Sequence, residues 1–193
     1  GEINWDKVEV FSAPIALGLV LLGVVLIFSF GGNTRFSTKE TAFAAVALAL
    51  SYALSFIKIF SMPQGGSLTP ASILPLLIFA YYFDWKKGII VGLIYSFLQL
   101  MQSPQIYHPI QVILDYPLAF TSVFVVGFFK PLGKKGFFIG AVCFGLIRYL
   151  CHVLSGSIFF GAWDTIDSWT FSLIYNSYVL IDLAITLVIG VLL

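Results

Sequence analysis

The chain has 193 residues, of which 60% are hydrophobic, 17% are aromatic and only 10% are charged. A soluble domain carries about a quarter charged residues, so this composition excludes an ordinary soluble domain and indicates a protein that folds in lipid. The net charge of +1 predicts no nucleic-acid partner, because the positive residues fall in short clusters between apolar runs. Cys143 and Cys151 would lie about 12 Å apart along a straight helix, too far for a disulfide.

Seven apolar runs follow one another, and each predicts a membrane helix. The first run follows an acidic segment with Glu2, Asp6 and Glu9, unlike the basic start of a signal peptide, so we expect a retained helix. The third and fourth runs are short, and Asp84-Trp85-Lys86-Lys87 separates them. These two runs predict either short, steep helices or a pair of helices bound at the membrane interface. The runs cover approximately residues 10–30, 40–60, 70–83, 88–102, 109–129, 136–155 and 170–193.

Two kinds of loop alternate between these runs. One kind is basic, and the other (61–69, 103–108 and 156–169) has no Lys or Arg and is polar, aromatic and glycine-rich. The positive-inside rule therefore predicts an outer N-terminus, a cytoplasmic C-terminus and a binding site that faces outward. The basic loops hold Arg35 and Lys39, Lys86 and Lys87, and Lys130, Lys134 and Lys135.

Four ionisable residues fall inside apolar runs, where each is a candidate functional residue. Arg148, His152 and Gly156 share one helix face, and Asp115 lies at a similar depth in the preceding run. A carboxylate, an imidazole and aromatic rings in a shallow outer pocket suit a flat organic cation. The alternative is an Arg148–Asp115 ion pair that only pins two helices, although one site could do both. Asp182 lies deeper, and we expect a structural partner for it, such as a tyrosine hydroxyl.

The sequence has no recognisable metal-binding or catalytic motif. No histidine or carboxylate spacing predicts a metal site, and neither a Walker A nor a GxSxG motif is present, so we expect no enzyme activity. If a chain without an ATPase motif were to import a ligand, it would have to draw energy from a partner or from an ion gradient. Ala42, Ala45, Ala49 and Ala53 form a stripe on which another helix could pack closely.

Four stretches together carry a family resemblance: residues 61–67, 108–116, 148–161 and 172–176. Over about residues 35–193, the chain resembles the thiamine-specific S components (ThiT or YuaJ type) of energy-coupling factor (ECF) vitamin transporters. The resemblance implies an all-α integral membrane protein of the bacterial cell membrane, with a six-helix bundle in residues 35–193. One extra transmembrane helix, in residues 1–34, would precede the bundle.

The same resemblance implies a function in ABC-type vitamin import. The protein would capture thiamine outside, and a transmembrane coupling subunit with two cytoplasmic ATPases would drive delivery inward, with no cofactor. The family's glutamate–tyrosine pair matches Asp115-Tyr116, where the aspartate is shorter. The expected thiamine contacts are Asp115, Tyr116, His152, Gly156, Phe160, Phe171 and Asn176. Lid or supporting roles fall to Gln64, Gly65, Gly66, Tyr107, Gln111 and Arg148, and coupling-subunit contacts to Ala42, Ala45 and Ala49.

Three other hypotheses stay open on the sequence alone. The ligand could be another flat vitamin or a thiamine precursor such as its pyrimidine, recognised by the same architecture. A solitary ion-coupled transporter would need no ATPase subunit. A membrane enzyme is disfavoured, because we find neither a nucleophile–base pair nor a set of metal ligands.

Overall fold

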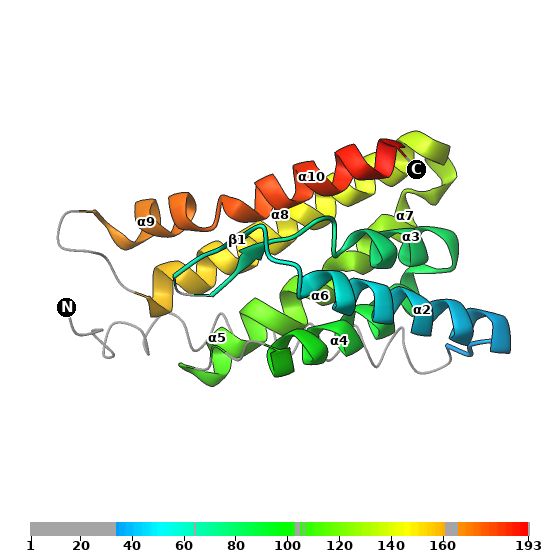
Figure 1. Cartoon of the computed structure of the whole chain (residues 1–193), viewed down its shortest axis with the longest axis horizontal. Coiled ribbons are helices and arrows are strands. Elements are labelled where there is room, and N and C mark those ends of the chain that lie inside the picture. Colours follow the sequence, from blue (N-terminus) through cyan, green and yellow to red (C-terminus); the bar gives the residue numbers. More distant parts are fainter. Residues whose placement is uncertain (1–33, 64, 103–104, 106, 161–165, 193) are drawn as a thin grey trace.

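The computed structural model describes residues 34–192 apart from 64, 103–104, 106 and 161–165 (Figure 1). The expected extra helix in residues 1–34 lies almost wholly outside the described residues. The described elements form six consecutive helical segments: α2 (Thr38–Ser55), α3 (Leu74–Tyr82), α4 (Trp85–Gln102), the stretch from α5 to α7, α8 (Gly133–Phe159) and the α9–α10 pair. A small antiparallel hairpin, β1 (Phe60–Ser61) and β2 (Ser67–Leu68), joins α2 to α3.

Helix α2 starts with a capping box. The Ser37 hydroxyl accepts from the Glu40 N–H, and the Glu40 carboxylate accepts from the Ser37 N–H, so free N–H groups of the first turn are satisfied. Glu40 also forms an ion pair with Lys87 at the start of α4, which fixes two helix ends side by side. The predicted run 40–60 is too long, since α2 ends at Ser55 and the chain then turns into the hairpin.

The segment from Pro109 to Phe128 is helical throughout but irregular. It consists of α5 (Pro109–Ile113), the π-helical turn η1 (Leu114–Leu118), α6 (Ala119–Thr121), the 3-10 turn η2 (Ser122–Phe124) and α7 (Val125–Phe128). Pro117 lies inside the π turn and has no N–H to donate, which favours a local change of hydrogen-bond spacing. The sequence predicted this span but not the turn within it.

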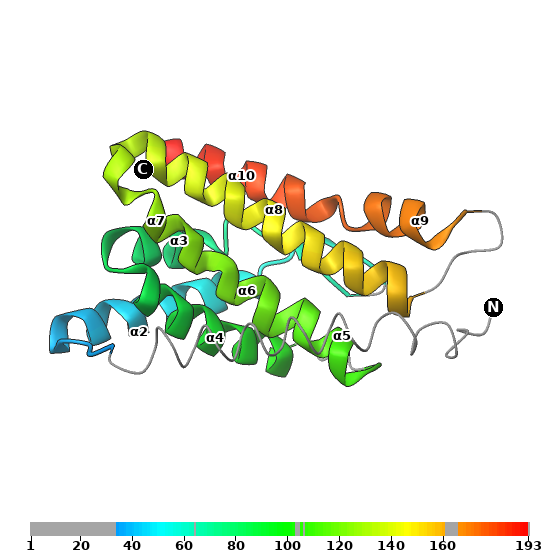
Figure 2. The same ribbon diagram turned by 180° about the vertical axis from the view of Figure 1, so that it is seen from behind.

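The last two segments pack against each other. Helix α8 has 27 residues and follows a 3-10 turn, η3 (Lys130–Leu132). The final predicted run divides into α9 (Ser168–Tyr175) and α10 (Tyr178–Leu192), with Asn176 and Ser177 between them. Both α9 and α10 contact α8, and the three helices run along one side of the molecule in Figures 1 and 2. Helices α2, α4 and α6 lie along the other side.

The two kinds of loop lie at opposite ends. Lys130 Nζ donates to the Tyr82 carbonyl over 2.5 Å, so the α7–α8 connection meets the end of α3 near the Glu40–Lys87 pair. The hairpin, α5 and α9 gather at the far end, as Figures 1 and 2 show. The alternation of basic and polar loops therefore corresponds to two ends of one bundle.

Apolar side chains fill the core of this bundle and also form much of its exterior. The core includes Leu76, Leu77 and Phe144, while many large apolar residues on the helix exteriors are exposed. An apolar exterior of this size suits lipid rather than water. By length and composition, three described segments are long and apolar enough to cross a membrane: Pro109–Phe128, Lys130–Phe159 and Ser168–Leu192.

Candidate functional site

A cavity of about 290 Å³ opens at the end of the bundle that holds the polar loops. The hairpin, α4, η1, α8, α9 and α10 all contribute to its walls. Every residue expected to contact the ligand lines it: Asp115, Tyr116, His152, Gly156, Phe160, Phe171 and Asn176. The structure thus brings together residues from three separate helical segments, while their role in binding stays a prediction.

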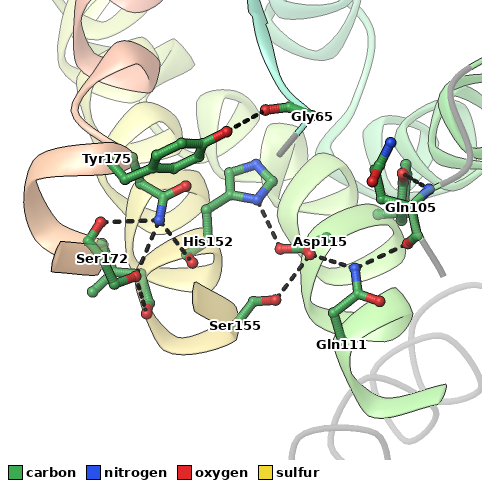
Figure 3. A network of polar contacts seen from close by, with 11 residues as sticks. Gly65, Gln105, Gln111, Asp115, His152, Ser155, Ser172 and Tyr175 are labelled. Atoms are coloured by element: carbon green, nitrogen blue, oxygen red, sulfur yellow. Dashed lines mark hydrogen bonds and ion pairs between the residues drawn. The ribbon is translucent and has the colours of Figure 1, made fainter. Parts of the chain in front are cut away.

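Asp115 is held by three hydrogen bonds (Figure 3). Its Oδ2 accepts from Gln111 Nε2 at 2.6 Å and from Ser155 Oγ at 2.8 Å, and its Oδ1 lies 2.9 Å from His152 Nδ1. In the tautomer with the hydrogen on Nδ1, His152 donates to this carboxylate. The carboxylate is therefore fixed in orientation before any ligand arrives.

The π turn sets where Asp115 and its neighbour point. Tyr116 follows Asp115 directly, yet both residues line the cavity, which the widened turn allows. The Tyr116 hydroxyl accepts from the Gln105 N–H at 3.1 Å, and Gln111 Nε2 donates to the Gln105 carbonyl at 3.1 Å. Gln111 is 0% exposed and its carboxamide oxygen accepts from the Tyr107 N–H, so one side chain ties the loop before α5 to the carboxylate.

Aromatic rings form much of the remaining wall. Phe160 packs edge-on against Tyr107 with centroids 5.1 Å apart, and Phe171 stacks on Tyr175 at 5.6 Å. Tyr178 contacts Tyr175 edge-on at 6.4 Å and lies beside His152. Such faces attract a flat, positively charged ring.

Asn176 lies at the break between α9 and α10. Its Nδ2 donates to the carbonyls of His152 and Ser172 at 3.1 and 3.0 Å, which joins the break to α8. Gly156 allows this approach, because a Cβ at that position would overlap the Ser172 hydroxyl. The two predicted contact residues thus also form the packing between α8 and α9.

The hairpin covers part of the cavity. Gly65 and Gly66 have φ values of +87° and +84°, which glycine adopts without strain. The Tyr175 hydroxyl donates to the Gly65 carbonyl at 3.0 Å, and Thr69 donates to Asp182 through both its N–H and its hydroxyl. Contacts at both ends therefore hold the hairpin against α9 and α10. Gln64, the other residue expected in the lid, lies outside the described residues.

Comparisons with known proteins identify the family. A profile of the family described as "Thiamine transporter protein (Thia_YuaJ)" matches residues 41–193. The chain belongs to the thiamine transporter family. It is 35% identical to the thiamine transporter ThiT of Bacillus subtilis (strain 168) over 134 residues, which cover 61% of this chain and 68% of that protein. It is 29% identical to ThiT of Lacticaseibacillus paracasei over 152 residues, covering 71% and 75% of the two chains.

The fold of this thiamine transporter family member agrees with a solved structure. ThiT from Listeria monocytogenes matches with a TM-score of 0.68 at 22% identity, over 79% of this chain and 92% of that one. The predicted all-α membrane fold of the ThiT-type S component is thereby confirmed. Membership of a transporter family also confirms the prediction that the chain is not an enzyme.

The Arg148–Asp115 ion pair, which the sequence left open as an alternative, does not form in this family member. Arg148 Nη1 bonds Asp182 Oδ2 at 3.1 Å, whereas Asp115 pairs with His152. Asp182 has structural partners, as expected, but these are Arg148 and Thr69 rather than a tyrosine hydroxyl. Helix α8 is oriented so that Arg148 faces α10. The spacing of residues within one helix does not determine which neighbouring helix a given face meets.

Some supporting residues lie behind the cavity wall. Tyr107 and Gln111 do not line the cavity, and they reach it only through Phe160 and Asp115. Sequence reasoning missed Ser155, although a step of three residues from His152 also marks the same helix face. Thr69 and Gln105 had no signal, since each acts through its place in a loop.

The described residues show two further features of the family member. Ala42, Ala45 and Ala49 are exposed on α2, so the small-residue stripe lies on the surface of the bundle. Among the described residues, no group of three His, Cys, Asp or Glu side chains could hold a metal ion. Both cysteines are free thiols.

Proposed function

We propose that this chain is the thiamine-capturing S component of an ECF-type importer. The observation that carries the proposal is the Asp115 carboxylate, fixed by Gln111, Ser155 and His152 beside aromatic rings in a cavity at the end of the bundle that holds the polar loops. A fixed carboxylate flanked by rings complements a flat cation such as the thiazolium of thiamine. Membership of the thiamine transporter family supports the same ligand.

Each part of thiamine has a matching part of the cavity in this proposal. Asp115 balances the permanent thiazolium charge, and His152 and Phe160 flank that ring. Tyr116, Phe171 and Asn176 recognise the aminopyrimidine by stacking and hydrogen bonding. The hairpin with Gly65 and Gly66 acts as a lid over the bound ligand.

Thiamine binding to the purified chain tests the ligand. We expect tight binding by tryptophan fluorescence and calorimetry, and a loss of at least tenfold in affinity in Asp115→Asn because the counter-charge is removed. Asp84→Asn is the matched control, since Asp84 accepts from the Lys86 N–H at the opposite end of the bundle. Equal affinities in all three proteins would refute the placement of the site. Competition with riboflavin and with the pyrimidine moiety distinguishes the alternative ligands.

The proposed partners are a transmembrane coupling subunit and two cytoplasmic ATPases, with the basic loops on the cytoplasmic side. The exposed stripe of Ala42, Ala45 and Ala49 supports this, because small residues let a partner helix approach closely. Ala45→Trp should leave thiamine binding intact and abolish ATP-dependent uptake in vesicles that contain the partners. Ile181→Trp, at an exposed position of α10, should retain uptake. Uptake without any ATPase subunit would instead indicate an ion-coupled transporter.

A further inference from the structure

The charged groups that line the cavity form an unequal set. Asp115 and Asp182 are negative and Arg148 is positive, while Lys58 is an exposed lining residue. With the His152 imidazole counted as neutral, the inner part of the cavity carries one net negative charge. Lys58 contributes little to this balance, because water and salt screen an exposed charge.

Asp182 is the group that brings the net charge of the inner cavity to −1. It is 1% exposed, and its Oδ2 accepts from Arg148 Nη1 at 3.1 Å. Its Oδ1 accepts from the Thr69 N–H and hydroxyl, both at 3.0 Å. Both oxygens of this buried carboxylate therefore accept hydrogen bonds within the protein.

Arg148 depends on this partner. Its guanidinium lies 5.0 Å from the Phe120 ring centroid, and its Nε has no hydrogen-bond partner among the described residues. Asp182 is thus the one carboxylate paired with Arg148 in the part of the chain that the structure describes. Removal of that carboxylate would leave a buried cation beside the cavity.

The Arg148–Asp182 pair lies close enough to the expected ligand position to affect a bound charge. Arg148 lies one helical turn from His152 on α8, which is about 6 Å along the axis. Unit charges interact strongly over such distances where protein excludes water. A ligand held near Asp115 and His152 is therefore within range of any unbalanced charge on Arg148.

We propose that Asp182 is a specificity-determining residue that cancels the charge of Arg148, so that the cavity selects a ligand with one positive charge. This inference rests on the proposed function, and it assigns to the pair a role beyond joining α8 to α10. A purely structural pair would affect charged and neutral ligands alike, whereas a charge-setting pair affects them differently.

The test compares two ligands of similar shape. Thiamine is cationic, and 3-deazathiamine is a neutral analogue in which carbon replaces the charged ring nitrogen. The measured quantity is the ratio of their affinities by calorimetry. We expect Asp182→Asn to lower the thiamine preference about tenfold and Arg148→Gln to raise it about tenfold. The double variant Arg148→Gln/Asp182→Asn restores the charge sum and should return the ratio of the parent.

Thr69→Val is the matched control. It removes one hydrogen bond to Asp182 without changing charge, so it should weaken both ligands by the same factor. If Asp182→Asn does not fold, Arg148→Gln is still expected to raise the ratio and the double variant to return it to that of the parent. Unchanged ratios in folded variants of a thiamine-binding parent would overturn the inference alone. A parent that binds neither compound would overturn the proposed function and the inference with it.

Discussion

Substitution of Ser155 by alanine should weaken thiamine binding although Ser155 does not line the cavity. The side chain is 0% exposed, and its hydroxyl donates to Asp115 Oδ2 at 2.8 Å. Alanine removes this donor with little change in volume. Asp115 then keeps Gln111 and His152 as partners and gains freedom to turn away from the ligand.

The size of the effect follows from these contacts. A hydrogen bond to a charged group contributes about 1.5–3 kcal/mol. Because Gln111 still donates to the same oxygen at 2.6 Å, we expect the lower limit, about 1.5 kcal/mol, which corresponds to about a tenfold increase in Kd. Calorimetry with thiamine measures this change directly.

A matched control separates positioning from general loss of stability. Ser96 is also 0% exposed, and its hydroxyl donates to the Leu93 carbonyl at 2.6 Å. Ser96 does not line the cavity. Ser96→Ala should keep the affinity of the parent. In an Asp115→Asn background, Ser155→Ala should cost much less than in the parent, since the charge is gone. An affinity equal to that of Ser96→Ala would refute the argument that Ser155 positions Asp115.

Two further predictions concern the hairpin and the start of α9. Gly66→Ala should speed thiamine dissociation several-fold in stopped-flow fluorescence, because alanine disfavours φ of +84° and its Cβ would overlap the Tyr178 ring. Gly133→Ala is the control, since Gly133 also has a positive φ but a Cβ there would have no neighbour within 4 Å. Equal dissociation rates in the two variants would contradict the role of the hairpin as a lid. Hydrogen bonds from Thr170, together with the Trp169 N–H, lower the pKa of the Asp167 carboxyl. Asp167→Ala should therefore lower the Tm at neutral pH, and the difference from the parent should shrink as the pH falls below about 4 and through the lowered pKa; a constant difference would contradict this cap.

Hydropathy and charge predicted most of the fold. Each apolar run that falls on described residues corresponds to a helical segment, because a chain in lipid must satisfy its backbone groups within the segment. The boundaries were less accurate at α2, where residues 56–60 are as apolar as the helix before them. The break at Asn176 was also missed, since hydropathy does not change there.

The site was predictable only in part. The face shared by Arg148, His152 and Gly156 follows from helical spacing, and the resemblance supplied the residues on other segments. The partner of Arg148 did not follow, because Asp115 and Asp182 lie in two different helices and the choice depends on how each helix is rotated. Long-range hydrogen bonds from loops, such as those of Thr69, have no local sequence pattern.

Because of the π turn at Leu114–Leu118, the direction in which the Asp115 side chain points depends on how many residues this turn contains. Each residue of an α-helix turns the chain by about 100°. Deletion of one residue from this turn would let the segment return to regular α-helical bonding and would rotate its outer half against α7. Asp115 and Tyr116 would then leave the cavity together although neither had been replaced. In related chains, a single-residue gap in this stretch therefore carries more information about the ligand than many substitutions do.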